Sequence, residues 1–473
     1  MLFQSFEFLI FFPIIFILFW ALNSWNLRAR NLFLLAASYF FYGYWDYRFL
    51  ALILFSSLLD YTIGISIGKT IKEGVKKRLL ALSVIFNIGI LAYCKYLNFF
   101  IENFVTLLAD IGMDQDISTL KIILPVGISF YTFQTLSYTI DVYRKNIEPE
   151  ENVITFLTFV SFFPQLVAGP IERASNLLGQ FCKKSEFTYE RGTEALRQIL
   201  YGLFKKIVIA DQCAIYANQA FANHDNLSAL YLILGAVFFA FQIYGDFSGY
   251  SDIARGISRL LGFDLMVNFK FPYFSKDIGE FWRRWHISLS TWFRDYVYIP
   301  LGGSRGGQWK TIRNVLIIFI VSGFWHGANW TFLAWGAIHA MLFIPSIFLR
   351  KKGKQSLPDV DNKVTLIDLG KIFYTFSLVC ITWVFFRADS ISHACSYIAG
   401  MFKVESFQFN GFYFKFLPIL TLFVLWEWFN KHSEFGWYYL PKNKVARWIV
   451  YLSVVCTIVY FRRDDNEFIY FQF

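Results

Sequence analysis

Long apolar runs alternate with short polar links along almost the whole chain. At about 1.5 Å per helical residue, such runs are long enough to cross much of a hydrocarbon layer about 30 Å thick. We expect membrane-crossing helices at Phe6–Leu22, Leu32–Trp45, Phe49–Ile67, Leu79–Ile101, Ile122–Ile140, Val153–Pro170, Leu227–Tyr244, Ile312–Phe324, Trp330–Leu349, Leu366–Phe386, Phe412–Phe429 and Val445–Phe461. The pattern predicts an all-α polytopic membrane protein with about 11 or 12 transmembrane helices.

Composition supports this class. Of 473 residues, 56% are hydrophobic, 21% aromatic and only 16% charged, and the mean hydropathy is +0.45. A soluble core cannot bury that much apolar surface, so we expect membrane lipids to cover it. The net charge of +10 lies in short clusters between apolar runs, which is typical of cytoplasmic loops and not of a nucleic-acid interface.

The polar links predict the orientation. Arg28, Arg30 and the basic link 69–78 mark cytoplasmic ends, whereas the acidic link 102–116 is expected outside, as is the N-terminus. The first residues lack the basic region of a cleavable signal. The alternation becomes ambiguous after Pro170, where Phe163-Pro164 and Gly169-Pro170 predict a broken and re-entrant helix.

The section 245–330 is the least lipid-like part of the chain. Asp246 and Asp252 could bind an amine or ion, although capping of a helix is the favoured interpretation. The glycine-rich loop Leu301–Gly307 could cradle a phosphate, but no Walker or dinucleotide spacing is present and a flexible turn is favoured. No metal-ligand spacing is found, so we expect no metal site.

Three of the six histidines, His286, His326 and His339, are candidates for chemistry. His326 lies between two apolar runs, where an ionisable side chain is costly and therefore a functional candidate. If this stretch is helical, Asn329 would offer it a hydrogen bond and Trp330 an aromatic wall. The alternative is a structural histidine bonded to a backbone carbonyl.

His286 belongs to a stretch with helical periodicity, 281–296, which predicts one amphipathic helix. Its aromatic face would hold Phe281, Trp285, Leu289, Trp292 and Tyr296. Arg283 and Arg294 would lie opposite, with His286 at the margin. The arginines could bind an anionic donor, although snorkelling to lipid phosphates is the commoner role.

Several motifs together resemble a known family. The block Trp282–Ser304, followed by Phe324–Trp330, resembles the membrane-bound O-acyltransferases, and within them the bacterial alginate O-acetyltransferase branch. Further similar stretches are Pro164–Ile171, Tyr244–Asp252 and Glu467–Phe473. The resemblance implies a ring of transmembrane helices, with amphipathic and re-entrant helices, around a thinned centre. It also implies one membrane-embedded domain over 1–473, with 245–330 as its catalytic section.

The resemblance implies roles for individual residues. His326 would be the catalytic general base, and His286 would position the acyl donor or assist proton movement. The donor would be acetyl-CoA or another acyl thioester, with no bound cofactor, and Arg283, Arg284 and Arg294 would hold its phosphates. The supporting residues would be Trp282, Trp285, Ser290, Trp325, Asn329 and Trp330, with Asn329 or Trp330 stabilising the oxyanion.

The implied function is transfer of an acetyl group across the bacterial inner membrane. The acceptor would be an extracytoplasmic glycan, or a periplasmic or surface acetyltransferase partner. D-alanyl or fatty-acyl transfer on the same fold is an alternative. A transporter that moves glycan or acyl groups without forming a bond is another, although the inverted repeats typical of transporters are not found.

Overall fold

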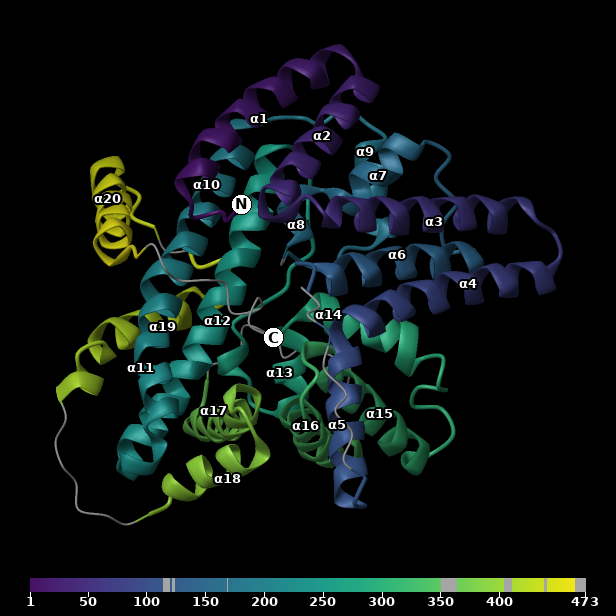
Figure 1. Ribbon diagram of the computed structural model, residues 1–473. Helices are drawn as coiled ribbons and strands as arrows, with labels where there is room; N and C mark the ends of the chain where they lie inside the picture. The colour runs from purple at the N-terminus through teal and green to yellow at the C-terminus, as the bar shows by residue number, and fades with distance from the viewer. Residues whose placement is uncertain are drawn as a thin grey trace. The chain divides into compact units, whose positions relative to one another are not determined.

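The computed structural model describes residues 1–113, 120, 124–167, 169–349, 364–403, 411–437 and 440–463. These residues form helices, turns and loops, with no strand among them, as Figure 1 shows. They divide into two compact units. Unit 1 comprises Met1–Leu196 and Ala254–Met266, and unit 2 comprises Arg197–Ile253 and Val267–Phe473.

Unit 1 is built from helices of the N-terminal part of the chain. They are α1 (Phe6–Trp25), α2 (Leu27–Asp46), α3 (Phe49–Lys69), α4 (Glu73–Leu91), η1 (Ala92–Tyr96), α5 (Leu97–Asp110), α6 (Ile128–Tyr143), α7 (Val153–Ser161), α8 (Phe163–Leu166) and α9 (Ala174–Phe181). α3, α4 and α6 lie side by side (Figure 1). Asp60 of α3 is fully buried between them and accepts hydrogen bonds from Ser83 of α4 (2.5 Å) and Thr139 of α6 (3.2 Å).

The helix predicted around Val153–Pro170 is interrupted. α7 ends at Ser161, and the short helix α8 begins separately at Phe163 with Pro164 in its first turn. Proline has no N–H to continue a helical ladder, which explains why the break occurs at this pair.

Unit 2 contains the C-terminal helices and most of the motif-rich section. They are η2 (Phe204–Ala210), α11 (Asp211–Ala222), η3 (His224–Asn226), η4 (Pro272–Phe274), α13 (Ile278–Arg284), α14 (Ile287–Phe293), η5 (Arg294–Tyr298), α15 (Gln308–His326), α16 (Trp330–Leu349), α17 (Leu366–Arg387), α18 (Ile391–Gly400), η6 (Gly411–Phe414), α19 (Leu417–Asn430) and α20 (Lys444–Phe461). Two long helices, α10 (Tyr189–Leu203) and α12 (Ala229–Leu260), contribute residues to both units.

Eight helical stretches among the described residues are long and apolar enough to cross a membrane. They are Phe6–Trp25, Phe49–Lys69, Glu73–Asp110, Ala229–Leu260, Trp330–Phe348, Leu366–Arg387, Gly411–Asn430 and Lys444–Phe461. The chain is therefore a multi-pass, all-α membrane protein. The other predicted crossings coincide with α2, α6, α7 with α8, and α15. These are helical but are shorter or more polar than the eight, so the count by this measure is lower than predicted.

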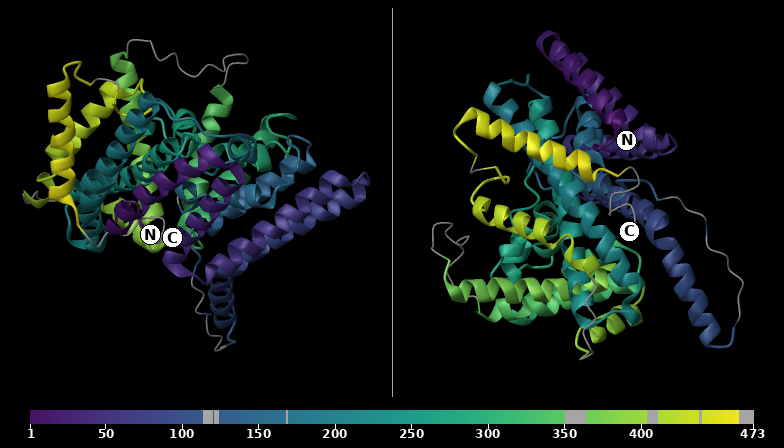
Figure 2. Two further views of the ribbon diagram at one scale, coloured as in Figure 1. Left: turned by 90° about the horizontal axis from the view of Figure 1, so that it is seen from above. Right: turned by 90° about the vertical axis from the view of Figure 1, so that its left-hand side faces the viewer.

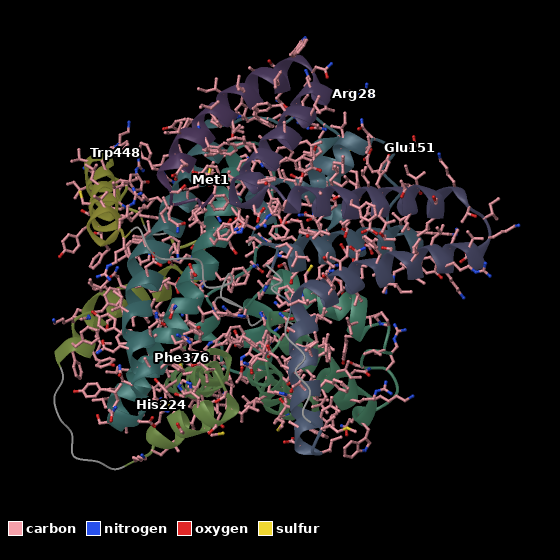
Figure 3. The ribbon with its side chains drawn as sticks, in the orientation of Figure 1. Met1, Arg28, Glu151, His224, Phe376 and Trp448 are labelled. Carbon is pink, nitrogen blue, oxygen red and sulfur yellow. The ribbon has the colours of Figure 1, made fainter. Side chains whose placement is uncertain are left out.

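The exposed surface of unit 2 suits a lipid environment. None of the span on α20 is buried, and this helix is the long yellow one in Figure 2. Trp448, labelled on α20 in Figure 3, is 62% exposed. Apolar side chains are exposed along this whole helix, and replacing the water around them with lipid lowers the free energy of the protein.

The helices α15 and α16 form a tight antiparallel pair (Figure 1). A Cβ atom on Gly323 would collide with the backbone oxygen of Phe332, and one on Gly336 would collide with that of Phe319. Glycine at both positions therefore allows the two backbones to approach closely. This pairing holds the end of α15, where His326 lies, against α16.

Candidate active site

The segment predicted as one amphipathic helix is two short helices, because the chain breaks at His286. α13 ends at Arg284, α14 begins at Ile287, and His286 between them has a left-handed backbone with φ +43°. This conformation is rare for residues other than glycine. The aromatic face is buried as predicted, but the continuous helix is wrong. The spacing of aromatic residues carries no sign of the break, which contacts from outside the segment stabilise.

Asn268 supplies those contacts. Its backbone oxygen accepts a hydrogen bond from Ile287 N (2.9 Å), and its Oδ1 accepts from Ser288 N (3.2 Å) and Ser288 Oγ (2.9 Å). The first N–H groups of a helix have no partner inside the helix, so Asn268 caps α14. The same Oδ1 lies 3.1 Å from Nδ1 of His286. Nothing in the sequence points to Asn268, since no spacing rule connects an asparagine with a histidine 18 residues later.

His326 is the last residue of α15 and is enclosed by aromatic rings. Its ring centroid lies 4.9 Å from that of Trp325, 5.3 Å from Trp335 of α16 and 5.3 Å from Phe386 of α17. The side chain is 5% exposed. Three helices therefore contribute to the enclosure of one imidazole, which shields it from bulk water.

The expected neighbours of His326 are placed differently, because α15 stops at His326 instead of continuing. Asn329 caps α16, its Oδ1 accepting from Thr331 N (3.0 Å) and its Nδ2 donating to the backbone oxygen of Asp389 (3.3 Å). Trp330 is 55% exposed. The helical arrangement that would have placed Asn329 and Trp330 one turn from the imidazole is therefore wrong.

The two candidate histidines lie together in unit 2. Their ring centroids are 6.4 Å apart, and Trp325 contacts both rings. Phe247 of α12 also packs edge-on against the His286 ring, with 4.6 Å between ring centroids. Burial lowers the pKa of His286 to about 3, so its imidazole is neutral at physiological pH.

The third candidate, His339 of α16, has partners on both ring nitrogens. Trp282 Nε1 donates to its Nδ1 (3.3 Å), and Thr382 Oγ1 lies 2.9 Å from its Nε2. Next to it, the indole N–H of Trp335 is buried without a hydrogen-bond partner among the described residues. His339 therefore has the contacts of a structural histidine.

The three predicted donor-binding arginines differ in their partners. Arg284 pairs with Glu280 (2.7 Å), and Arg294 pairs with the adjacent Asp295 (2.7 Å). Arg283 is exposed and has no hydrogen-bond or ion-pair partner in the described part of the chain. Of the three guanidinium groups, that of Arg283 is therefore the one whose charge no carboxylate of the described residues offsets.

The remaining predicted supporting residues belong to the segment 281–296 around His286. Trp282 and Trp285 are buried, and Ser290 Oγ donates to the backbone oxygen of Trp285 (3.3 Å). This bond joins the start of α14 back across the break at His286. The serine thus supports the local backbone.

The glycine-rich loop forms a turn. The N–H groups of Gly302, Gly303 and Arg305 donate to Ile299 (3.0 Å), Tyr298 (2.9 Å) and Gly302 (3.0 Å). These amides are used inside the loop, so they do not form a phosphate cradle. The turn favoured from the sequence is confirmed.

The two acidic residues of the Gly245–Asp252 motif do not cap a helix. α12 continues to Leu260, and both residues lie within it as partners of buried lysines. Lys206 Nζ is 2.8 Å from Asp246, and Lys205 Nζ is 2.5 Å from Asp252. The capping interpretation is wrong because the helix extends beyond its apolar run. The two lysines are paired inside unit 2.

Comparison with known proteins supplies the family. The model of the membrane-bound O-acyltransferase family matches residues 48–388, which include both histidines of the enclosure. The chain belongs to this family. It is therefore an acyltransferase, and the resemblance inferred from the motifs is confirmed. The similar stretch Glu467–Phe473 lies outside the described residues.

Three relatives illustrate which proteins this acyltransferase is similar to. A probable alginate O-acetylase of Pseudomonas putida is 41% identical over 384 residues, covering 81% of this chain and 77% of the relative. A peptidoglycan O-acetyltransferase of Helicobacter pylori is 35% identical, covering 83% and 77%. A teichoic acid D-alanyltransferase of Streptococcus thermophilus is 32% identical, covering 55% and 68%.

Proposed function

We propose that this chain moves an acetyl group from a cytoplasmic thioester to a hydroxyl group outside the membrane, with His326 as general base. The acceptor would be an extracytoplasmic polysaccharide or a partner acetyltransferase. The observation that carries the proposal is the pairing of His326 with His286, at 6.4 Å between ring centroids, inside one buried aromatic enclosure of an acyltransferase.

Acyl transfer to an alcohol needs a group that takes the hydroxyl proton and a donor that stabilises the developing oxyanion. A neutral imidazole at His326 would take the proton and return it to the leaving thiolate. Trp335 is in ring contact with His326, and its buried N–H has no partner among the described residues. It is therefore better suited as the oxyanion donor than Asn329, whose Nδ2 already donates to the backbone oxygen of Asp389. The aromatic enclosure would limit hydrolysis of the thioester by excluding water.

The acyl donor would approach along the segment that carries the three predicted donor-binding arginines. The exposed, uncommitted guanidinium of Arg283 suits the phosphates of acetyl-CoA or of another carrier thioester. Arg284 and Arg294 would contribute less, because Glu280 and Asp295 already offset their charges. We propose section 245–330 as the catalytic part of one membrane domain, in the inner membrane, with the N-terminus outside.

The direct test is His326→Ala in cells, with the exposed His432→Ala as a matched control. We expect His326→Ala protein to accumulate in the membrane at a normal level, while O-acetyl content of the envelope glycan falls to that of a deletion strain. His432→Ala should acetylate normally. Normal acetylation in the His326→Ala strain would remove this residue from the mechanism.

Acetyl transfer is favoured over D-alanyl transfer because the alginate relative matches more of this chain at higher identity than the D-alanyltransferase does. Purified protein in liposomes, supplied with labelled acetyl-CoA or with an aminoacyl carrier protein, separates the two donors. Transport without bond formation would move labelled acyl groups or glycan across the liposome without producing an acyl ester.

A further inference from the structure

The hydrogen-bond geometry around Asn268 determines which nitrogen of His286 carries the hydrogen. The atom that accepts from Ser288 N, at 3.2 Å, must be the side-chain oxygen of Asn268, because a backbone N–H can only donate. That oxygen, 3.1 Å from His286 Nδ1, cannot donate in return. The hydrogen between them therefore belongs to Nδ1.

A neutral histidine has one ring hydrogen, so Nε2 of His286 carries a lone pair. The residue is 1% exposed, and Nε2 has no hydrogen-bond partner among the described residues. A buried polar atom without a partner is costly in free energy, which makes a functional role the more economical explanation. The strained backbone of His286 is a second cost at the same position.

We propose that Asn268 is a positioning residue that holds His286 in the Nδ1–H form and so makes Nε2 a proton-accepting atom of the acyl-transfer site. This inference rests on the proposed function. It also decides between the two roles expected for His286. A neutral ring that offers only a lone pair cannot hold donor phosphates, which require hydrogen-bond donors or positive charge. The role that remains is proton movement.

The surroundings of His286 restrict where a proton can go. Its ring contacts are Phe247 of α12, Phe269 of the loop before η4, and Trp325 and His326 of α15. Of these four side chains, only His326 is titratable. A proton accepted by Nε2 would therefore come from the substrate or from His326, and it would return to one of them.

The first test reads the tautomer directly, without any acyl-transfer assay. Full-length protein labelled with ¹⁵N-histidine is reconstituted in lipid, and the His286 signals are identified as those missing from His286→Gln. We expect a protonated Nδ1 and an unprotonated Nε2 at neutral pH. An Nε2–H tautomer or an imidazolium would overturn the inference, whatever the enzyme's substrate proves to be.

The second test uses Asn268→Asp, which retains the oxygen that accepts from Ser288 and His286 and therefore retains the cap on α14. The added carboxylate favours the imidazolium and raises the pKa of His286, so that Nε2 becomes protonated at a higher pH than in the wild type. We expect the acid-side limb of the acyl-transfer pH profile to move upward by about 1 to 3 pH units, with full activity recovered as the pH rises further. A role limited to capping α14 would leave the pH profile unchanged.

Ser251→Ala is the matched control for Asn268→Asp. It removes only the long contact of Asn268 Nδ2 with Ser251 Oγ (3.5 Å) and leaves Oδ1 untouched. We expect wild-type tautomer signals and a wild-type pH profile. A wild-type profile in Asn268→Asp as well, or an equal shift in Ser251→Ala, would contradict the assignment to Oδ1.

Discussion

Two buried histidines of unit 2, His286 and His339, use their ring nitrogens in opposite ways. At His339 the indole N–H of Trp282 can only donate, so Nδ1 is the acceptor and Nε2 carries the hydrogen, which it donates to Thr382. The Thr382 hydroxyl donates onward to the backbone oxygen of Val379 (2.7 Å). At His286 the order is reversed, with Nδ1 donating to Asn268 and Nε2 left over.

The difference shows that burial alone does not distinguish a functional histidine from a structural one. Both side chains are almost completely buried. The distinguishing feature is whether the surrounding groups use the whole hydrogen-bonding capacity of the ring. A fully used ring stabilises the helices that it joins, whereas a ring with a spare lone pair can do chemistry at some cost in stability.

The largest expected effect on stability is that of His339→Ala. Losing the ring creates a cavity and leaves the Trp282 N–H without an acceptor, which together should cost about 3 to 4 kcal/mol. Thermal unfolding in detergent measures this cost. His286→Ala also leaves a cavity but removes the unpartnered Nε2, so its unfolding temperature should fall less than that of His339→Ala, while acyl transfer is lost. Equal losses of unfolding temperature in the two variants would break the comparison.

The next largest effect is a pH dependence of the folding stability, which His286 causes. Its pKa is lowered by burial to about 3 in the folded protein, whereas an unfolded chain gives about 6.5. The unfolded state therefore binds more protons between these values, and folding stability falls as the pH decreases below about 6.5. The loss should reach roughly 3 kcal/mol at about pH 4.

Unfolding of the wild type and His286→Gln across this pH range provides the measurement. Glutamine does not titrate, so this part of the acid-side loss should be absent from the variant, and the two curves should run parallel above about pH 7. Identical slopes at acid pH would show that His286 is not held neutral by burial.

The smallest effect is expected for Thr382→Val, which replaces a hydroxyl with a methyl group of similar size. His339 Nε2–H loses its acceptor, and the free energy of unfolding should fall by about 1 to 2 kcal/mol with acyl transfer retained. Calorimetry and an acetylation assay on the same preparation test both parts. A loss of activity without a loss of stability would show that His339, like His286, has a functional role.

Much of the fold class and part of the site could be predicted from the sequence. Long apolar runs have no stable place outside lipid, so the all-α membrane class followed from Phe6–Leu22 and the runs like it. The motifs around His286 and His326 were sufficient to indicate the family. These features depend on residues that are neighbours in the sequence, so they can be predicted without the structure.

Other features depended on contacts that local patterns do not contain. The break at His286 and the pairing of Lys205 with Asp252 each involve a partner from another part of the chain. At His286, hydrogen bonds to Asn268 support the break between the two short helices. Tertiary partners of this kind override helical propensity.

The sequence by itself determined that this chain is a multi-pass acyltransferase and which histidines to examine, because hydropathy and motif spacing are properties of neighbouring residues. Only the tertiary structure decided how those histidines differ. The proton position on an imidazole depends on what faces each nitrogen. For His286 and His339 these partners are Asn268, Trp282 and Thr382, which come from distant parts of the chain.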